Sequence, residues 1–276
     1  DVSTYNSVLA AFARQGDVDG ALEQLRSMMG RDSVKPNIAS YNYVIEAAVP
    51  KGKWEVAMEV LAEMKRAGFR PGTKAYGSVV AACQKGGNTD GALSALSEMT
   101  KSGVTADART FGSAMTACSE AGRVHDCLYL LKVMKSGGGP MAPAVLNYNI
   151  AVNACSRSGD WQAALRLLRE MRVSGLDPNE ITYSSVMDAC AKAGQVETAL
   201  QLLTDMLLEG LEPNEVSYNT AISACAQGGD YSAAVGLLRE MQDCGFAPDV
   251  LSYSSAIKAC LSGKAPEKAL ELLDEM

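Results

Sequence analysis

The sequence has few of the residues from which catalytic and metal sites are usually built, and it has no long apolar run. It contains a single histidine, His125, and two tryptophans in 276 residues. No stretch approaches the ~18 consecutive apolar residues of a membrane span, and no charged-then-apolar signal segment opens the chain. No Cys-x-x-Cys pair or His-x-Glu motif is present, which argues against zinc and deaminase centres. We therefore predict no membrane span, metal, cofactor, small-molecule substrate or catalytic residue, and no enzymatic activity.

The eight cysteines are too far apart for a clustered metal site, but six of them are regularly spaced along the chain. Each of the six comes directly after an alanine, and successive members are 35, 37, 35, 35 and 35 residues apart. They are Cys83, Cys118, Cys155, Cys190, Cys225 and Cys260. Regular spacing of this kind favours a small buried side chain in a reducing compartment over a disulfide or a ligand.

Other residues recur with the same spacing, which identifies internal repeats. With the cysteine numbered as position 11, position 4 is aromatic and position 27 is methionine in all eight repeats, and position 20 is alanine or cysteine. Position 15 is glycine in seven repeats, from Gly16 to Gly229. The repeats cover 2–37, 38–72, 73–107, 108–144, 145–179, 180–214, 215–249 and an incomplete 250–276. We treat 1–276 as one solenoid domain, and we expect it to be part of a longer chain.

Apolar positions within a repeat have the period of a helix. Tyr218, Ala221, Ile222 and Cys225 fall at i, i+3, i+4 and i+7, and the same spacing recurs from Ala234 onward. Glycine at position 15 ends the first helix, and Gly and Pro near the end of the repeat stop the second. Helices of about eleven residues cannot bury an apolar stripe alone, so neighbouring pairs must stack. The sequence predicts an all-α fold, an α-solenoid of about eight helix-turn-helix repeats of 35–37 residues.

The repeat motif resembles that of the pentatricopeptide repeat family, in its P-type form. Residues 216–222 and 237–241, followed by Pro248 and Asp249, carry this resemblance, and equivalent residues recur in register along the chain. The resemblance implies a right-handed solenoid that binds single-stranded RNA along its first helices, one nucleotide per repeat. Position 5 and the last position of a repeat would read the base edge, while an apolar position 2 would sandwich the base faces.

Carried onto this sequence, the resemblance implies that repeats five to seven are competent readers. Asn149 with Asn179 is similar to a pyrimidine reader favouring C, Ser184 with Asn214 to an A reader, and Asn219 with Asp249 to a U reader. The implied site is 5′-C/U, A, U-3′, and Ser254 begins an eighth reader. The sandwiching residues are Leu146, Ile181, Val216 and Leu251. Arg157 and Lys192, on first helices, are weak candidates for phosphate contacts.

Repeats one to four match this reading pattern less well. Asn6 with Asn37 is a plausible pyrimidine pair, but its sandwich position is Ser3. The next three pairs contain a glycine or alanine, and glycine has no side chain with which to hydrogen-bond a base edge. They are Asn42 with Gly72, Gly77 with Asp107, and Gly112 with Ala144, and their sandwich positions are Ala39, Lys74 and Arg109. We expect base reading to concentrate after residue 145.

The charge of the chain keeps a second hypothesis open. The net charge is −7, with repeats six and seven contributing −5 and −4, whereas nucleic-acid binders usually present basic surfaces. Many of these acidic residues fall on second helices and turns, away from the expected groove. The first hypothesis is an organellar RNA-binding protein, in a chloroplast or mitochondrion, acting in RNA processing, stability or translation. The alternative is a scaffold whose repeats hold a protein partner within a larger organellar assembly such as a ribosome or transcription complex.

Overall fold

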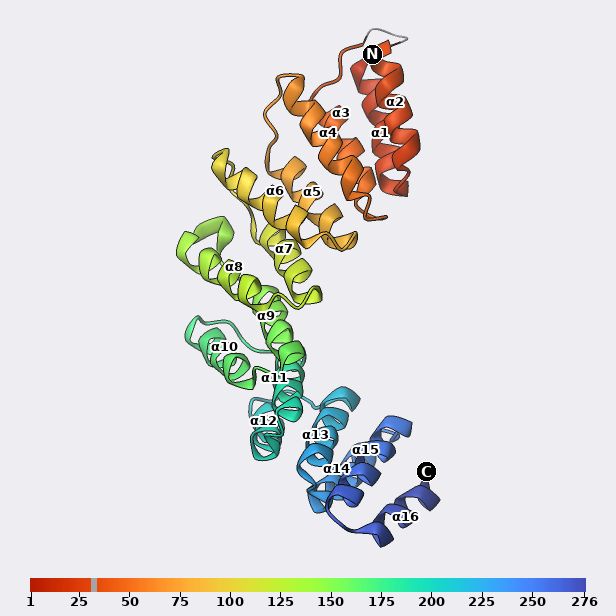
Figure 1. The fold of residues 1–276 in the computed structure, drawn as a ribbon, viewed down its shortest axis with the longest axis vertical. Helices are drawn as coiled ribbons and strands as arrows, with labels where there is room; N and C mark the ends of the chain where they lie inside the picture. Colours follow the sequence, from red (N-terminus) through yellow and green to blue (C-terminus); the bar gives the residue numbers. More distant parts are fainter. Residues whose placement is uncertain (31–33) are drawn as a thin grey trace. The chain divides into compact units, whose positions relative to one another are not determined.

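A computed structural model describes residues 1–30 and 34–276, and within these ranges it contains sixteen α-helices, one short 3-10 helix and no strand (Figure 1). The α-helices are α1 Val2–Gln15, α2 Val18–Gly30, α3 Ile38–Ala48, α4 Trp54–Arg66, α5 Thr73–Lys85, α6 Thr89–Lys101, α7 Ala108–Glu120, α8 Val124–Gly137, α9 Val145–Ser158, α10 Trp161–Val173, α11 Glu180–Lys192, α12 Val196–Leu208, α13 Glu215–Gly228, α14 Tyr231–Asp243, α15 Val250–Ser262 and α16 Pro266–Glu275. The 3-10 helix η1, Gly139–Met141, follows α8. The predicted all-α fold is confirmed. None of the described helices is both long enough and apolar enough to cross a bilayer.

Each first helix begins at the first residue of a repeat, and the residue before it supplies the N-cap. The side chains of Asn37, Asp107, Asn179, Asn214 and Asp249 each accept a hydrogen bond from the backbone N–H three residues later. Such caps satisfy backbone donors that have no partner inside the helix. The last position of a repeat, expected to read a base, therefore also starts the next helix.

Position 15 ends each first helix with a positive φ in all eight repeats. Seven of these residues are the predicted glycines, with φ between 61° and 74°, and the eighth is Lys264, with φ 58°. The left-handed conformation is open to glycine and costly for other L-residues. The sequence placed the glycine of the last repeat one residue early, at Gly263, but the backbone keeps the common position and places a lysine there.

The small and aromatic residues that recur at equivalent positions of the repeats form the core. The six regularly spaced cysteines are fully buried. The small residues at position 20 and the methionines at position 27 are also buried, except that Ala269 is slightly exposed and Met276 is exposed. The interpretation of these cysteines as packing residues is confirmed. Burial raises the pKa of five of these thiols to about 11, at Cys83, Cys118, Cys155, Cys190 and Cys225.

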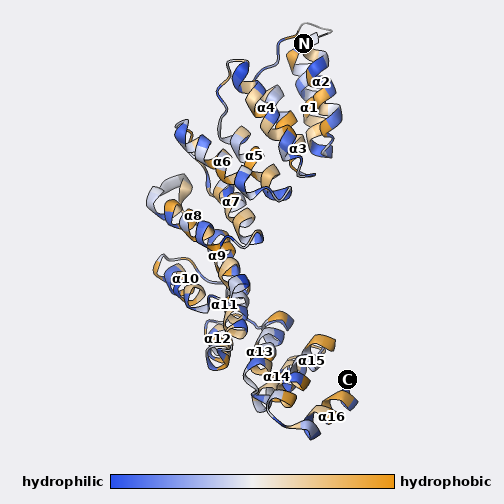
Figure 2. Ribbon diagram, in the orientation of Figure 1, coloured by the Kyte–Doolittle hydropathy of each residue, from blue (hydrophilic) through white to orange (hydrophobic). Residues whose placement is uncertain are grey.

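The described chain divides into two compact units, Asp1–Pro143 and Ala144–Met276, each containing four repeats. We call them the N-terminal and C-terminal units. Within each unit, successive first helices contact one another, and each second helix contacts the first helix of its own pair and of the next. Apolar and polar residues alternate around the helices, so every helix buries one side (Figure 2). Stacking in each unit therefore aligns equivalent positions of the first helices in rows.

Candidate nucleic-acid interface

A row of exposed apolar side chains runs along the first helices of the C-terminal unit. Leu146, Ile181, Val216 and Leu251 occupy position 2 of α9, α11, α13 and α15, and their exposed fractions are 66, 63, 60 and 60 %. We call these four residues the apolar row. Large apolar side chains aligned on a surface are typical of a binding site, because exposure to water costs free energy that a flat apolar ligand recovers. Their spacing of one per repeat fits a ligand made of repeating flat groups.

Hydrogen-bonding groups lie one turn further along each of these helices. In repeat five, Nδ2 of Asn149 donates to Oδ1 of Asn179 at 3.2 Å. Asn149 is 9 % exposed, whereas Asn179 is half-buried at the start of α11. The structure therefore brings the two residues of this predicted reader together.

The pairs of repeats six and seven are connected through a third residue. Oγ of Ser184 lies 3.3 Å from Oγ of Ser217, whose hydroxyl also reaches Oδ1 of Asn214 at 3.3 Å. In repeat seven, the hydroxyl of Ser252 contacts Oδ1 of Asn219 at 2.6 Å and Oδ1 of Asp249 at 2.8 Å. Both predicted pairs are brought together in this indirect way.

Asp249 and Ser254, both predicted base readers, differ in their hydrogen-bonding state. Hydrogen bonding to Ser252, chiefly from its backbone N–H at 2.8 Å, lowers the pKa of Asp249, so its carboxylate stays ionised and accepts hydrogen bonds only. Ser254, the predicted eighth reader, donates its hydroxyl to the backbone carbonyl of Val250 in its own helix. Residues 250–276 do not include a last repeat position that could pair with Ser254.

Sequence reasoning did not single out the third residue of these contacts. It stands at position 3 of the following repeat and is Ser40, Thr182, Ser217 or Ser252, all fully buried. A signal was present, because a serine or threonine directly precedes the position-4 tyrosine in these repeats. A polar residue that recurs in register beside an aromatic core residue indicates a buried hydrogen bond.

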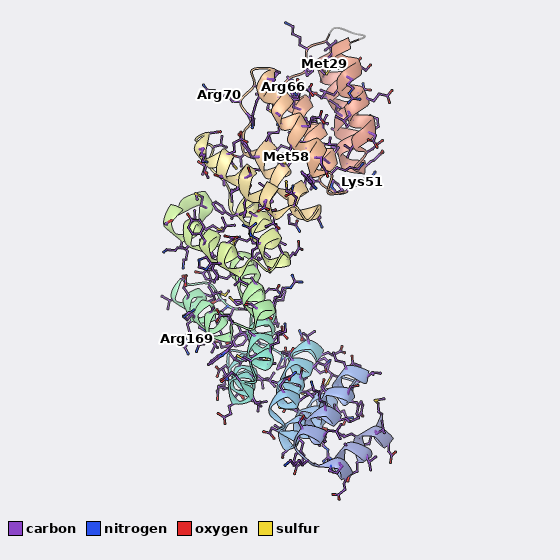
Figure 3. All side chains as sticks on the ribbon, viewed as in Figure 1. Met29, Lys51, Met58, Arg66, Arg70 and Arg169 are labelled. Atoms are coloured by element: carbon purple, nitrogen blue, oxygen red, sulfur yellow. The ribbon has the colours of Figure 1, made fainter. Side chains whose placement is uncertain are left out.

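The predicted phosphate contacts lie on the first helices, but Lys192 already has an anionic partner. Its Nζ is 2.6 Å from Oδ2 of Asp188, one turn earlier in α11. Arg157 is exposed near the end of α9. Charged side chains cover both units, and Arg66 on α4 and Arg169 on α10 extend from second helices (Figure 3). Asp188 shows that the acidic residues are not confined to second helices and turns.

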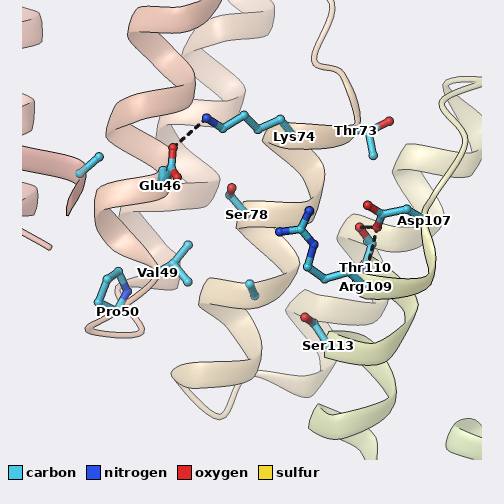
Figure 4. A pocket seen from close by; sticks show the side chains of 13 residues that line it. Glu46, Val49, Pro50, Thr73, Lys74, Ser78, Asp107, Arg109, Thr110 and Ser113 are labelled. Carbon is cyan, nitrogen blue, oxygen red and sulfur yellow. Dashed lines mark hydrogen bonds and ion pairs between the residues drawn. The ribbon is translucent and has the colours of Figure 1, made fainter. Parts of the chain in front are cut away.

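The N-terminal unit has a groove in place of an apolar row. It has a volume of about 870 Å³ and is lined by residues of α3, α5 and α7 (Figure 4). Lys74 crosses it and pairs with Glu46, with Nζ 2.9 Å from Oε2, while Asp107 caps α7 through Thr110. Arg109, at position 2, is exposed. This groove therefore carries charged groups of both signs next to apolar residues such as Val49 and Pro50.

The reading positions of this unit are mostly incomplete. Asn6 and Asn37 are brought together, with Nδ2 of Asn6 donating to Oδ1 of Asn37 at 3.3 Å, and Ser3 beside them is exposed. At Gly77, a Cβ atom would lie 3.0 Å from the hydroxyl oxygen of Thr110. The Thr110 hydroxyl thus lies next to the point where a side chain at position 5 would be attached.

The chain matches a known family of repeat proteins along its length. The chain matches the family model described as the pentacotripeptide-repeat region of PRORP over residues 2–142 and 141–276. The fold is an α-solenoid of helical-pair repeats, as the sequence predicts. The chain belongs to the pentatricopeptide repeat family. No curated protein sequence gives a significant match.

Several solved structures share the fold. The crystal structure of the pentatricopeptide repeat protein PPR10 in complex with an 18-nt psaJ RNA element is 25% identical, with a TM-score of 0.81, and the match covers 100% of this chain and 40% of that one. PPR10 from maize gives 22% identity and a TM-score of 0.68, covering 100% and 43%. The PPR domain of Arabidopsis thaliana protein-only RNase P 1 (PRORP1) in complex with tRNA gives 21% and 0.51, covering 58% and 84%. The chain thus spans about 40% of the length of PPR10.

Proposed function

We propose that the chain binds single-stranded RNA along the first helices of its C-terminal unit and reads 5′-C/U, A, U-3′ with repeats five to seven. The apolar row is the observation that carries this proposal. Four exposed apolar side chains, one per repeat, lie beside hydrogen-bonding side chains, which form pairs in repeats five to seven. Unstacked bases need both, since their faces are apolar and their edges carry donors and acceptors.

The RNA complex of PPR10, which matches this chain over its whole length, supports the choice of ligand. The roles of Arg157 and Lys192 toward phosphates stay predictions, and the ion pair of Lys192 with Asp188 makes its contribution small. An organellar location and a role in RNA processing, stability or translation stay predictions from family membership. The absence of an enzymatic activity stays a prediction from the sequence, which has no clustered catalytic or metal-binding residues.

The test is fluorescence anisotropy of the 276-residue chain with short RNAs containing C-A-U, U-A-U or scrambled sites, at two salt concentrations. We expect preferential binding to the C-A-U site, and the Asn219→Thr variant should move the preference of repeat seven from U toward G. Gln201→Thr, on the exposed side of α12, is the matched control and should leave the preference unchanged. Equal, weak and salt-abolished binding to every RNA would reject sequence-specific reading.

A protein-binding scaffold is the second candidate, and the N-terminal unit favours it. Its groove of about 870 Å³ exposes Arg109, holds the Lys74–Glu46 ion pair and lacks an apolar row. Charged side chains of both signs, together with neutral polar groups, suit contact with the surface of a protein better than contact with a stack of bases. If the RNAs bind without preference, this groove is the place to seek a protein partner.

A further inference from the structure

A buried hydroxyl group connects the two reading residues in four repeats of this chain, and in three of these repeats the residue at position 5 is an asparagine. In these three repeats the hydroxyl belongs to position 3 of the following repeat and is that of Ser40, Thr182 or Ser252, each with an exposed fraction of 0 %. We call these three residues the bridging hydroxyls. Each bridging hydroxyl lies in the same compact unit as the two reading residues that it contacts. Buried hydroxyls need hydrogen-bond partners, and here the partners are the reading side chains.

The contacts in repeat five determine the orientation of the Asn149 amide. The hydroxyl of Thr182 donates to Oδ1 of Asn149 at 2.6 Å and accepts the backbone N–H of Asn179 at 3.1 Å. Oδ1 of Asn179 in turn accepts the backbone N–H of Thr182 at 3.1 Å and one N–H of Asn149 at 3.2 Å. Both amide oxygens are thus engaged by protein donors, and the unshared N–H groups of both amides remain for a ligand.

The same arrangement recurs with different outer groups. In repeat seven, the hydroxyl of Ser252 donates to Oδ1 of Asn219 at 2.6 Å, and the backbone N–H of Ser252 donates to Oδ1 of Asp249 at 2.8 Å. Nδ2 of Asn219 and Oδ2 of Asp249 are left for a ligand. In repeat one, the hydroxyl of Ser40 donates to Oδ1 of Asn6 at 2.7 Å.

Repeat two shows what happens without the hydroxyl. Its position-5 residue is Asn42, and position 3 of the following repeat is Ala75. Oδ1 of Asn42 is buried and has no hydrogen-bond partner among the described residues. Within the same unit, Ser40 satisfies the equivalent oxygen of Asn6. The hydroxyl, and not the helix geometry alone, therefore holds the amide oxygen.

We propose that the bridging hydroxyls are specificity-determining positioning residues, which hold the amide oxygen of position 5 inward so that only its N–H groups face the base. Repeat five then presents donors alone, which suit the adjacent acceptors N3 and O2 of cytosine and oppose the N3–H of uracil. Repeat seven presents one donor and one carboxylate acceptor, which match O4 and N3–H of uracil. This inference rests on the proposed function and narrows the first base of the site from C/U to C.

The experiment compares Thr182→Val, which removes the hydroxyl, with Thr182→Ser, which keeps it, in the 276-residue chain. RNA probes differ only in C or U opposite repeat five, and the readout is the ratio of the two Kd values. We expect the wild type to prefer C by roughly 5–100-fold, as for a two-point base contact. In Thr182→Val the ratio should fall to within about twofold. Thr182→Ser should restore it, while the U preference of repeat seven stays unchanged in all three proteins.

A retained C preference in a folded Thr182→Val protein would overturn the positioning role and leave the proposed function standing. No base preference at any repeat of the wild type would overturn both. Loss of the hydroxyl also removes a partner of the Asn179 backbone N–H, so circular dichroism must show that the helices are intact. If Thr182→Val does not fold, Ser252→Ala applies the same test to repeat seven, where the U preference should fall to within about twofold.

Discussion

Replacing Lys264 with glycine is expected to stabilise the last repeat. Lys264 is the one non-glycine residue with a positive φ, 58°, in the part of the chain that the structure describes. The backbone around it matches the other repeats. Its neighbour Ala265 donates its N–H to the carbonyl of Cys260 at 2.8 Å, as Gln195 does to Cys190 at 2.9 Å. The turn that ends α15 therefore requires the left-handed conformation whichever residue occupies the position.

The size of the effect follows from two opposing terms. The left-handed conformation costs an L-residue about 1–2 kcal/mol, and glycine removes this cost. Glycine also adds freedom to the unfolded chain, which costs about 0.4–1 kcal/mol. The side chain of Lys264 is exposed and makes no hydrogen bond or ion pair with residues 1–30 or 34–276, so its removal costs no polar contact. We expect a net gain of about 0.5–1 kcal/mol.

Amide hydrogen exchange in α15 and α16 measures this gain where it arises, because repeats open locally and end repeats fray first. Exchange should slow by roughly two- to fivefold. Lys264→Ala keeps the strained conformation and should give no comparable gain. Gly194→Lys makes the reverse change at φ 68°, where an added Cβ meets no atom within 4 Å, and should destabilise repeat six. Unchanged or faster exchange in Lys264→Gly would refute the argument from backbone strain.

Two further predictions concern buried groups. Ala75→Ser should supply the missing partner of the Asn42 oxygen and raise the free energy of unfolding by about 0.5–1.5 kcal/mol; urea unfolding would show no gain in an Asn42→Ala background if this contact is the cause. Stability should fall as pH rises from about 8.5 to about 11, because unfolded thiols ionise near their usual pKa of about 8.5 while the buried ones, such as Cys155 and Cys190, have a pKa of about 11. The unfolded state then binds fewer protons, so unfolding is favoured, and a urea midpoint that stays constant across this range would contradict the assignment.

The fold was predictable because the repeat imposes the same demand many times. A single Ala-Cys pair says little, but its recurrence every 35 residues identifies a helix face, and the burial of Cys225 and Met241 follows from their spacing. Lys264 shows that the backbone conformation, and not the glycine itself, is what all eight repeats share at position 15. The motif assigns glycine to position 15, whereas the backbone requires a positive φ, and the lysine accepts that conformation at a cost.

The candidate site was predictable at its outer residues and not at its inner one. Leu146 and Asn149 were found because family resemblance assigns roles to position 2 and position 5. Thr182 was missed because its side chain is buried and one repeat away, 33 residues along the chain from Asn149. The pairing of Lys192 with Asp188 was missed for a similar reason, since a charged residue counts equally in the sequence whether or not it has a partner.

If the proposed function holds, position 3 links the stability of this chain to its base preference. The backbone N–H and hydroxyl of Thr182 take part in the capping box that starts α11, and the same hydroxyl holds the Asn149 amide. A substitution there must change both properties, whereas one at Ile181, which is exposed, need change only the contact with a base. The two residues are adjacent in sequence, but the side chain of Ile181 is exposed and that of Thr182 is buried. If the proposed function holds, the first turns of α11 and α15 each contain a residue that contacts the base and a residue that orients the group beside it.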